Sequence, residues 1–142
     1  MMNAAEFFTL AQQFQKPYEK LLGRIADSCG ISRIELDILL FLHNNPQFDT
    51  AHDIVQVRGI AKSHVSKAVE LLYNRGFLDA EVDKNDRRVV RLKLLPAADP
   101  AIHAGKKAQQ SFVQSIFSGV SENDLNALQR VLEQINQNLR LL

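Results

Sequence analysis

The sequence lacks several of the features that mark common classes of protein. It has one cysteine in 142 residues, Cys29, so no disulfide bond can form within the chain. The net charge is only +1, which by itself says nothing about nucleic acid as a partner. No apolar run approaches the ~18 residues of a membrane span, and residues 1–16 lack the basic start of a secretory signal. We therefore expect one soluble domain over residues 1–142, located in a reducing cytoplasm without membrane association.

The patterns of catalytic and metal sites are also missing. No nucleophile and base stand at a suggestive spacing, and there is no glycine-rich phosphate loop and no carboxylate cluster. The histidines are scattered, without a His-x-x-x-His spacing, which leaves only a convergence of Cys29, His43 and His103 in three dimensions as a metal site. We expect a protein that is not an enzyme and that holds no metal or other cofactor.

Charge is distributed unevenly along the chain. Residues 58–93 hold nine Lys and Arg against five Asp and Glu, whereas the rest of the chain has an acidic surplus. A basic middle flanked by acidic ends is typical of a DNA-reading module on a neutral or acidic scaffold. A charged surface without any partner would give the same count, so charge alone does not decide between the two.

The N-terminal segment has the apolar spacing of a helix. In residues 4–28, apolar residues recur three and four positions apart, as on one face of a helix. Pro17 falls inside this segment, and an interior proline removes a backbone hydrogen bond and clashes with the preceding turn. We expect either a kink near residues 13–16 or a separate arm, followed by a new helix that begins at Pro17.

Capping and breaking signals predict three further helices outside the basic segment. Ser32 and Glu35 have the spacing of a capping box at the start of a helix over residues 32–43. Residues 99–141 hold two segments with helical apolar spacing, which Gly119 separates.

The pattern of a helix-turn-helix motif starts just before the basic segment and continues into it. A short helix over residues 51–57 ends before Gly59, and a second helix over residues 61–74 ends before Gly76. Small, polar and basic side chains gather on one side of the second helix, so this side is expected to face solvent. The side chains expected to face inward are Val65, Ala68, Val69, Leu72 and Tyr73.

Two predicted strands and a charged loop follow the second helix. Residues 77–82 and 89–94 have the composition of strands, and residues 83–88 form a charged loop between them. Apolar and polar residues alternate in the second strand, which predicts one half-buried face. The apolar residues of that face are Val90, Leu92 and Leu94.

Together these segments resemble the MarR family of bacterial transcription regulators over the whole chain. Residues 61–69 are similar to the recognition helix of that family, residues 72–78 to its exit into the wing, and residues 83–88 to its Asp-rich and Arg-rich wing. Two features depart from the family pattern: residues 94–100 lack the usual Leu-Thr step and nearby glycine, and Pro17 lies in the first helix.

The resemblance implies a mainly α fold, an α+β winged helix-turn-helix with a two-stranded wing hairpin. It implies a DNA-binding lobe over residues 32–95 and a dimerisation region built from residues 4–28 and 99–141. It further implies a homodimer that binds a near-palindromic operator on double-stranded DNA, and a repressor released by a small aromatic or phenolic effector. A winged-helix module whose basic wing binds an acidic protein is the alternative.

Two groups of residues are candidates for DNA contact. In the second helix of the motif, hydroxyl, imidazole and ammonium groups suit base edges and phosphates. In the wing, arginine suits a narrow minor groove, and Asp86 is expected to orient a neighbouring arginine. Without DNA, the same residues would form a solvated helix face and a surface ion pair. The candidates are Lys62, Ser63, His64, Ser66, Lys67, Lys84, Arg87 and Arg88, and the family pattern favours Arg88 for the groove.

The predicted terminal helices carry more apolar surface than a single elongated chain would cover. A twofold dimer would bury it and would place two recognition helices about 34–36 Å apart on one face of DNA. Folding back onto the chain's own core is the alternative. The residues concerned are Phe7, Phe8, Leu10, Phe14, Ile135, Leu139, Leu141 and Leu142.

Few residues are candidates for sensing a signal. Tyr18, Arg24 and His43 are assigned to the effector pocket that the resemblance implies between the dimer helices and the DNA-binding lobe. Cys29 is the only candidate for oxidation, yet it lies at a helix end rather than at a helix start, where thiols become reactive. Its position favours a small, partly buried structural residue.

Overall fold

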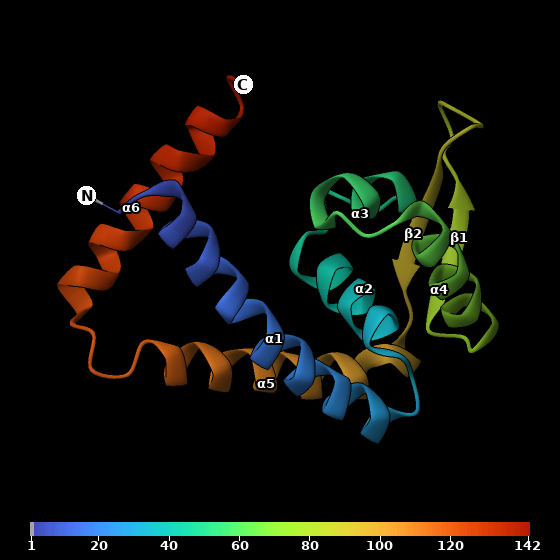
Figure 1. Ribbon diagram of the computed structural model, residues 1–142. Helices are drawn as coiled ribbons and strands as arrows, with labels where there is room; N and C mark the ends of the chain where they lie inside the picture. The colour runs from blue at the N-terminus through green and yellow to red at the C-terminus, as the bar shows by residue number, and fades with distance from the viewer. Residues whose placement is uncertain (1) are drawn as a thin grey trace. The chain divides into compact units, whose positions relative to one another are not determined.

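The computed structural model describes residues 2–142 and divides the chain into two compact units. The first unit extends to Gln110, and the second covers Ser111–Leu142, so that helix α5 crosses the division. The elements up to α5, in chain order, are α1 (Ala4–Cys29), α2 (Arg33–Asn44), α3 (Ala51–Arg58), α4 (Lys62–Asn74), β1 (Leu78–Val82), β2 (Val90–Leu94), a 3-10 turn (Pro96–Ala98) and α5 (Asp99–Ile116), as drawn in Figure 1.

Helices α2 and α3 begin at the capping boxes that the sequence contains. The hydroxyl groups of Ser32 and Thr50 accept hydrogen bonds from the amides of Glu35 and Asp53, whose carboxylates accept bonds from the Ser32 and Thr50 amides in return. Gly59 ends α3 in the left-handed region, with φ 65°. The predicted bounds of both helices are confirmed to within about one residue.

Helix α1 is one continuous helix that passes through Pro17, so the predicted separate arm is wrong. Proline deprives the carbonyl of Gln13 of its helical donor. Both residues are exposed, however, and water can donate to that carbonyl at little cost. A capping box between Asn3 and Glu6 also fixes the helix start ahead of the proline. The bend expected near residues 13–16 stays a prediction.

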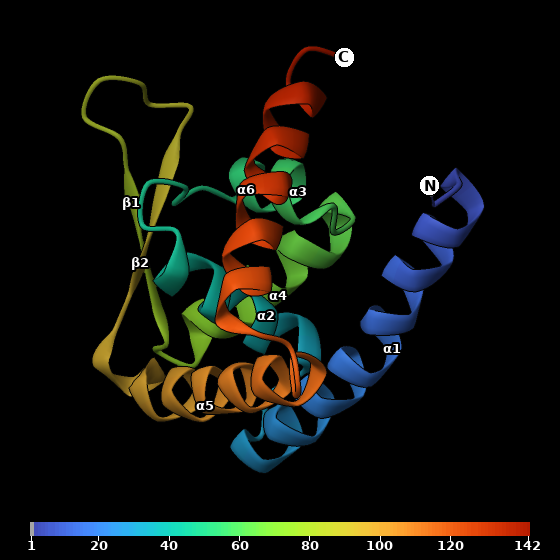
Figure 2. The same ribbon diagram turned by 90° about the vertical axis from the view of Figure 1, so that its left-hand side faces the viewer.

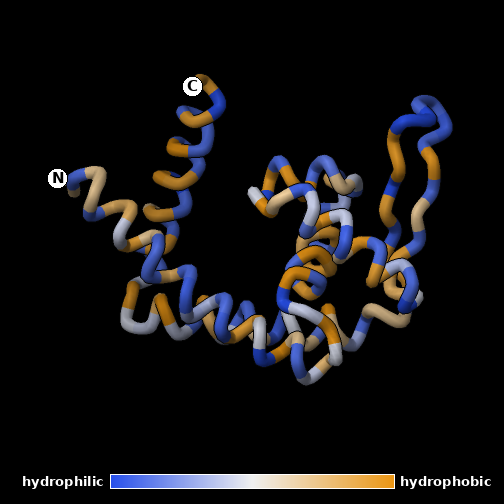
Figure 3. The backbone as a smooth tube through the Cα atoms, turned by 45° about the vertical axis from the view of Figure 1, so that its right-hand side comes forward, coloured by the Kyte–Doolittle hydropathy of each residue, from blue (hydrophilic) through white to orange (hydrophobic). Residues whose placement is uncertain are grey.

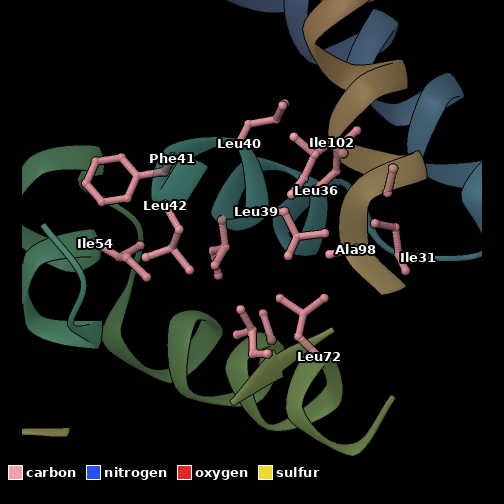
Figure 4. Close-up of a cluster of buried hydrophobic side chains, with 14 of the residues drawn as sticks. Ile31, Leu36, Leu39, Leu40, Phe41, Leu42, Ile54, Leu72, Ala98 and Ile102 are labelled. Atoms are coloured by element: carbon pink, nitrogen blue, oxygen red, sulfur yellow. The ribbon is translucent and has the colours of Figure 1, made fainter. Parts of the chain in front are cut away.

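The core of the first unit is built around α2. Its residues from Leu36 to Leu42 are all buried, so the helix is covered on every side along this stretch. Figure 4 shows its side chains reaching Ile102 of α5 on one side and Ile54 of α3 and Leu72 of α4 on the other. Helices α3 and α4 and the hairpin thus share one hydrophobic core with α2 and α5.

Gly105 of α5 packs against Leu36 and Leu40 of α2. A Cβ atom at this position would lie 2.9 Å from both terminal methyl groups of Leu40 and 3.2 Å from one of Leu36. Real Cβ contacts are essentially never as short as 2.9 Å, so any larger residue at this position would require the Leu40 side chain to move within the core.

The two strands form an antiparallel hairpin, in which Leu78 faces Leu94 and Val82 faces Val90. Its base is anchored, because Leu78 and Leu92 are buried in the core. Val82 and Val90 are exposed, so the expected burial of Val90 is wrong. The reason is that the hairpin extends beyond the helices of its unit, as Figure 2 shows.

The second unit contains the end of α5 and α6 (Glu122–Leu139). Gly119 adopts φ 82° in the turn between them, and Ser121 caps α6 by accepting a hydrogen bond from the Asp124 amide at 3.1 Å. The predicted break between two helices is confirmed. Within the described chain α6 has no buried residue, and Figure 3 shows hydrophobic and hydrophilic residues alternating along its turns.

Candidate DNA-binding surface

Helix α4 buries one side and presents the other to solvent. Val65, Ala68 and Leu72 are each at most 4% exposed, and they form a narrow buried stripe. Tyr73 lies about 100° around the helix from Leu72, and it is exposed, so its predicted inward position is wrong. The five candidate residues of α4 are all exposed: Lys62, Ser63, His64, Ser66 and Lys67.

The start of α4 is chemically unlike the starts of α1, α2 and α3. Asn3, Ser32 and Thr50 each accept a hydrogen bond at the first turn of their helix. The residue before α4 is Ala61, and among residues 2–142 no side chain caps this helix. The first-turn amides of α4 are therefore available to an anion, which the helix dipole also favours. Lys62 adds a positive charge in the same turn.

The wing loop (residues 83–89) is an ordered turn. The Asp83 amide donates to the Val89 carbonyl at 2.8 Å, and the Val89 amide donates to the Asp86 carbonyl at 3.0 Å. Oδ2 of Asp83 accepts bonds from the amides of Asn85 and Asp86, at 3.0 and 2.9 Å. These backbone hydrogen bonds, with a further bond from Arg91, lower the pKa of the Asp83 carboxyl.

Asp86 pairs with Arg88, one of the two arginines that follow it in the sequence. Oδ1 of Asp86 accepts bonds from the Arg88 amide at 3.0 Å and from Nε at 3.2 Å, and Oδ2 lies 3.3 Å from Nη2. These bonds from Arg88 lower the pKa of the Asp86 carboxyl. The Arg88 side chain is still 90% exposed, and Lys84 and Arg87 are also exposed. Contact of any of them with DNA stays a prediction.

Arg91 is a charged residue of this surface for which the sequence gives no local signal. From β2, its Nη1 donates to Oδ1 of Asp49 at 2.8 Å and its Nε donates to Oδ1 of Asp83 at 3.2 Å. Hydrogen bonds to Asp49 and then Asp83 keep the pKa of Arg91 above its usual value. The strand register places Glu81 opposite Arg91. Pairing rules would therefore have suggested Glu81 rather than a residue 42 positions away.

A pocket of about 440 Å³ lies beside the start of α4, within the first unit. Tyr18 of α1, Asp37 of α2, Arg58 of α3 and His64 of α4 are among the residues that line it. Arg58 Nη2 donates to both carboxylate oxygens of Asp37. One wall of the pocket thus carries a predicted effector residue, Tyr18, and another carries a predicted DNA-contact residue, His64.

The other two effector candidates lie outside this pocket. Arg24 is exposed on α1 and is not among the pocket's lining residues. His43 Nε2 lies 3.2 Å from Nζ of Lys106 in α5. The Tyr18 hydroxyl instead accepts a bond from Gln109 Nε2 at 2.7 Å. The structure does not bring Tyr18, Arg24 and His43 into one site.

Cys29 is partly buried and packs against the core, with its Sγ 3.9 Å from Ser28 Oγ. Residues 2–142 contain no group of three His, Cys, Asp or Glu placed to hold a metal ion, so Cys29, His43 and His103 do not converge. Across the same residues, none of the helices combines the length and the apolar character needed to cross a bilayer.

The helix-turn-helix and the wing loop lie within a segment that matches the model of a known protein family. The model of the MarR family matches residues 30–89, from the turn before α2 to the end of the wing loop. We call residues 30–89, which match this family model, the MarR-family segment. This MarR-family segment contains α2, α3, α4, β1 and every candidate DNA-contact residue.

Relatives extend the match beyond the MarR-family segment. The Bacillus subtilis (strain 168) protein YdgJ, an uncharacterized HTH-type transcriptional regulator, is 22% identical over 121 residues, which cover 84% of this chain and 73% of YdgJ. The structure of the transcriptional regulator PA3341 aligns with a TM-score of 0.82 and 24% identity over 96% of this chain and 99% of its own.

A third relative was solved with DNA. It is a Listeria monocytogenes protein assigned to the MarR family of transcriptional regulators and complexed with a 26mer DNA, and it aligns with a TM-score of 0.79 and 14% identity. The alignment covers 98% of this chain and 90% of the Listeria chain. These structures confirm the predicted fold class, since residues 2–142 form six α-helices with a two-stranded wing in the MarR arrangement.

Proposed function

We propose that the chain is a homodimeric transcription regulator that binds a near-palindromic DNA operator in a sequence-specific manner. In this proposal α4 lies in the major groove, and the wing loop places Arg88 in the adjacent minor groove. The observation that carries it is the presence in one unit of an uncapped, basic helix start at Ala61–Lys62 and an arginine held outward on an ordered wing. The MarR-family match and the Listeria DNA complex favour DNA over an acidic protein as the partner.

The solvent-facing side of α4 has the chemistry to read base edges. The Ser66 hydroxyl and the His64 imidazole can donate and accept hydrogen bonds, whereas Lys62 and Lys67 suit phosphates. The buried stripe of Val65, Ala68 and Leu72 on the other side of α4 fixes the rotation of the helix about its axis, and so which side chains face solvent. Base preference is therefore assigned to His64 and Ser66, and general affinity to the lysines and Arg88.

A second copy of the chain is the proposed partner of the apolar faces in both units. Four residues of α1 are 41–63% exposed: Phe7, Phe8, Leu10 and Phe14. In the second unit, Val131, Leu132 and Leu139 are 53–61% exposed. Burying such surface is favourable at about 25 cal/mol per Å². A twofold interface that covers it would also supply two α4 helices to one operator.

The pocket beside α4 is the proposed binding site for an effector. The Tyr18 ring, with the paired Asp37 and Arg58 nearby, suits a small aromatic or phenolic molecule. Because His64 lines the same pocket, an occupant would move a residue assigned to DNA contact. The ligand-free protein would then be the repressor. Phenol or benzoate should weaken operator binding, and Tyr18→Ala should reduce that effect.

Operator affinity of variants tests the proposed function. Fragments bound by the purified protein are selected from the DNA of its own organism, and affinities are measured by fluorescence anisotropy at several salt concentrations. Arg88→Ala is expected to weaken binding by about 1–3 kcal/mol, whereas Lys16→Gln on α1 removes the same charge and should change little. Ser66→Ala should relax base preference, and wild-type affinity should fall with salt by ~0.9 log units per log unit for each phosphate contact. Unchanged operator affinity after Arg87→Ala plus Arg88→Ala would refute the role of the wing.

A further inference from the structure

Asp49 binds strand β2, the strand that follows the wing loop. This residue lies in the connection between α2 and α3, directly before the cap of α3. Its carbonyl accepts a hydrogen bond from the Leu92 amide at 2.7 Å, and its carboxylate accepts one from Arg91 at 2.8 Å. Strand β2 is therefore bound twice to the same residue, once through the backbone and once through a side chain.

The side-chain contact continues into the wing loop. Arg91 also donates to Oδ1 of Asp83. The other oxygen of Asp83, Oδ2, accepts hydrogen bonds from the amides of Asn85 and Asp86. Asp86 in turn holds Arg88. An unbroken series of hydrogen bonds thus connects the α2–α3 connection to the arginine assigned to the minor groove. We call Asp49, Arg91 and Asp83 the wing clamp.

The charges of the wing clamp make Arg91 a poor phosphate ligand. Its guanidinium faces two carboxylates, so the three side chains carry a net negative charge. A phosphate that approached Arg91 would be repelled by Asp49 and Asp83 at close range. Arg88 differs, because it has one carboxylate partner and is 90% exposed, whereas the Arg91 side chain is 44% exposed.

We propose that Arg91 is a positioning residue: by joining Asp49 to Asp83 it sets where the wing presents Arg88, and it does not itself touch DNA. The predicted effect of Arg91 on operator affinity rests on the proposed DNA-binding function. Its effect on the wing loop is independent of DNA. Charge counting treats every basic residue of the segment 58–93 as a possible DNA contact. In this proposal Arg91 instead supports DNA binding indirectly, through its ion pairs with Asp49 and Asp83.

The sharpest consequence concerns Asp49→Ala. This change removes a negative charge from the DNA-facing unit, so simple electrostatics predicts tighter binding to DNA. Loss of the wing clamp predicts weaker binding. Arg91→Gln should weaken binding to a similar extent, and the double variant should bind no more weakly than Arg91→Gln alone, because both changes break one unit. Lys93→Gln is the matched control, since Lys93 is an exposed cation on the same strand.

Two measurements on the full-length protein test the proposal. The first is amide hydrogen exchange without DNA, where Asp49→Ala, which removes one partly exposed ion pair, and Arg91→Gln, which removes two, should speed exchange of the Asp83 and Val89 amides by roughly fivefold. Lys93→Gln should leave these amides unchanged. The second is operator affinity, which should fall by roughly fivefold in both clamp variants, with melting temperatures recorded to exclude unfolding.

The outcomes separate this inference from the proposed function. Faster exchange of the wing amides supports the clamp even if the wild-type protein were to bind no DNA, a result that would defeat the proposed function alone. Wild-type exchange rates in both clamp variants would overturn the clamp. Equal or tighter operator binding by Asp49→Ala would overturn the positioning of Arg88 by Arg91.

Discussion

Arg58, the last residue of α3, donates two hydrogen bonds from Nη2 to the carboxylate of Asp37 in α2, at 2.9 and 2.8 Å. The Asp37 side chain is 10% exposed and that of Arg58 is 40% exposed. The pair ties the helix at the centre of the core to the turn of the helix-turn-helix, next to Gly59. A partly buried ion pair thus lies directly before the turn from which α4 begins.

Arg58→Ala is expected to lower the free energy of unfolding by about 2 kcal/mol, because it leaves the Asp37 carboxylate buried without its cation. Asp37→Ala should cost about 1 kcal/mol, since the guanidinium can turn toward water. Urea denaturation measures both. Arg33→Ala is the control, because Arg33 lies 3.9 Å from Glu19 with both side chains more than a third exposed. Equal losses for Arg33→Ala and Arg58→Ala would contradict this account.

The Asp83 carboxyl is expected to titrate below the ordinary value for aspartate, because its charged form accepts two backbone amides and the Arg91 side chain. A lowered pKa means that the carboxylate stabilises the wing above the ordinary pKa and loses this effect as the pH falls through the lowered value. Wing-loop exchange should therefore keep the same protection between pH 7 and pH 5. NMR titration of the Asp83 carboxyl carbon provides the measurement.

Arg91→Gln should raise that pKa only part of the way, because the amides of Asn85 and Asp86 still donate to Asp83. A full return to the ordinary value in this variant would show that the turn itself had opened. An ordinary pKa in the wild-type protein would rule out the hydrogen bonds described for the wing loop.

Ala61→Asp is expected to separate folding stability from DNA binding. An aspartate before α4 would cap its free amides and raise the free energy of unfolding by roughly 0.5–1 kcal/mol. The same carboxylate would occupy the place proposed for a DNA phosphate, so operator affinity should fall. Ala61→Ser supplies a cap without a charge and should lose less affinity. Thermal melting and fluorescence anisotropy report the two effects, and unchanged affinity in Ala61→Asp would place the phosphate elsewhere.

Gly105→Val is expected to destabilise the first unit by about 1–3 kcal/mol, because the added carbons collide with Leu40 and Leu36 in a filled core. Gly23→Val is the control on an open helix position, where an added Cβ meets nothing within 4 Å. Urea denaturation of the two variants should show the larger loss at Gly105. Equal losses would mean that helix propensity, rather than packing, determines the effect.

Local signals in the sequence predicted most of the helices and the exposed side of α4. Capping boxes at Ser32 and Thr50 depend on residues three apart, so they can be read without any tertiary information. The exposed residues of α4 follow from helical period. The same local reasoning was wrong for Pro17, because the cost of a lost hydrogen bond depends on solvent access to Gln13, which the sequence does not reveal.

Contacts between residues far apart in the chain could not be predicted from local sequence patterns. Arg91 pairs with Asp49 across 42 positions, and nothing in the spacing distinguishes Asp49 from other carboxylates. Tyr18 was assigned to a pocket from resemblance, and it lines one, but its proposed companions Arg24 and His43 lie outside it. Distances between elements far apart in the chain decide such sites, and those distances are set by how the helices pack.

Sedimentation of the purified chain with and without a selected operator duplex tests the central claim most directly. The account predicts a dimer in free solution and two chains on one duplex, with half-sites about 10 base pairs apart. Raising the salt concentration should dissociate the DNA complex while leaving the dimer intact. A single chain that stays monomeric and ignores every double-stranded DNA at low ionic strength would contradict it.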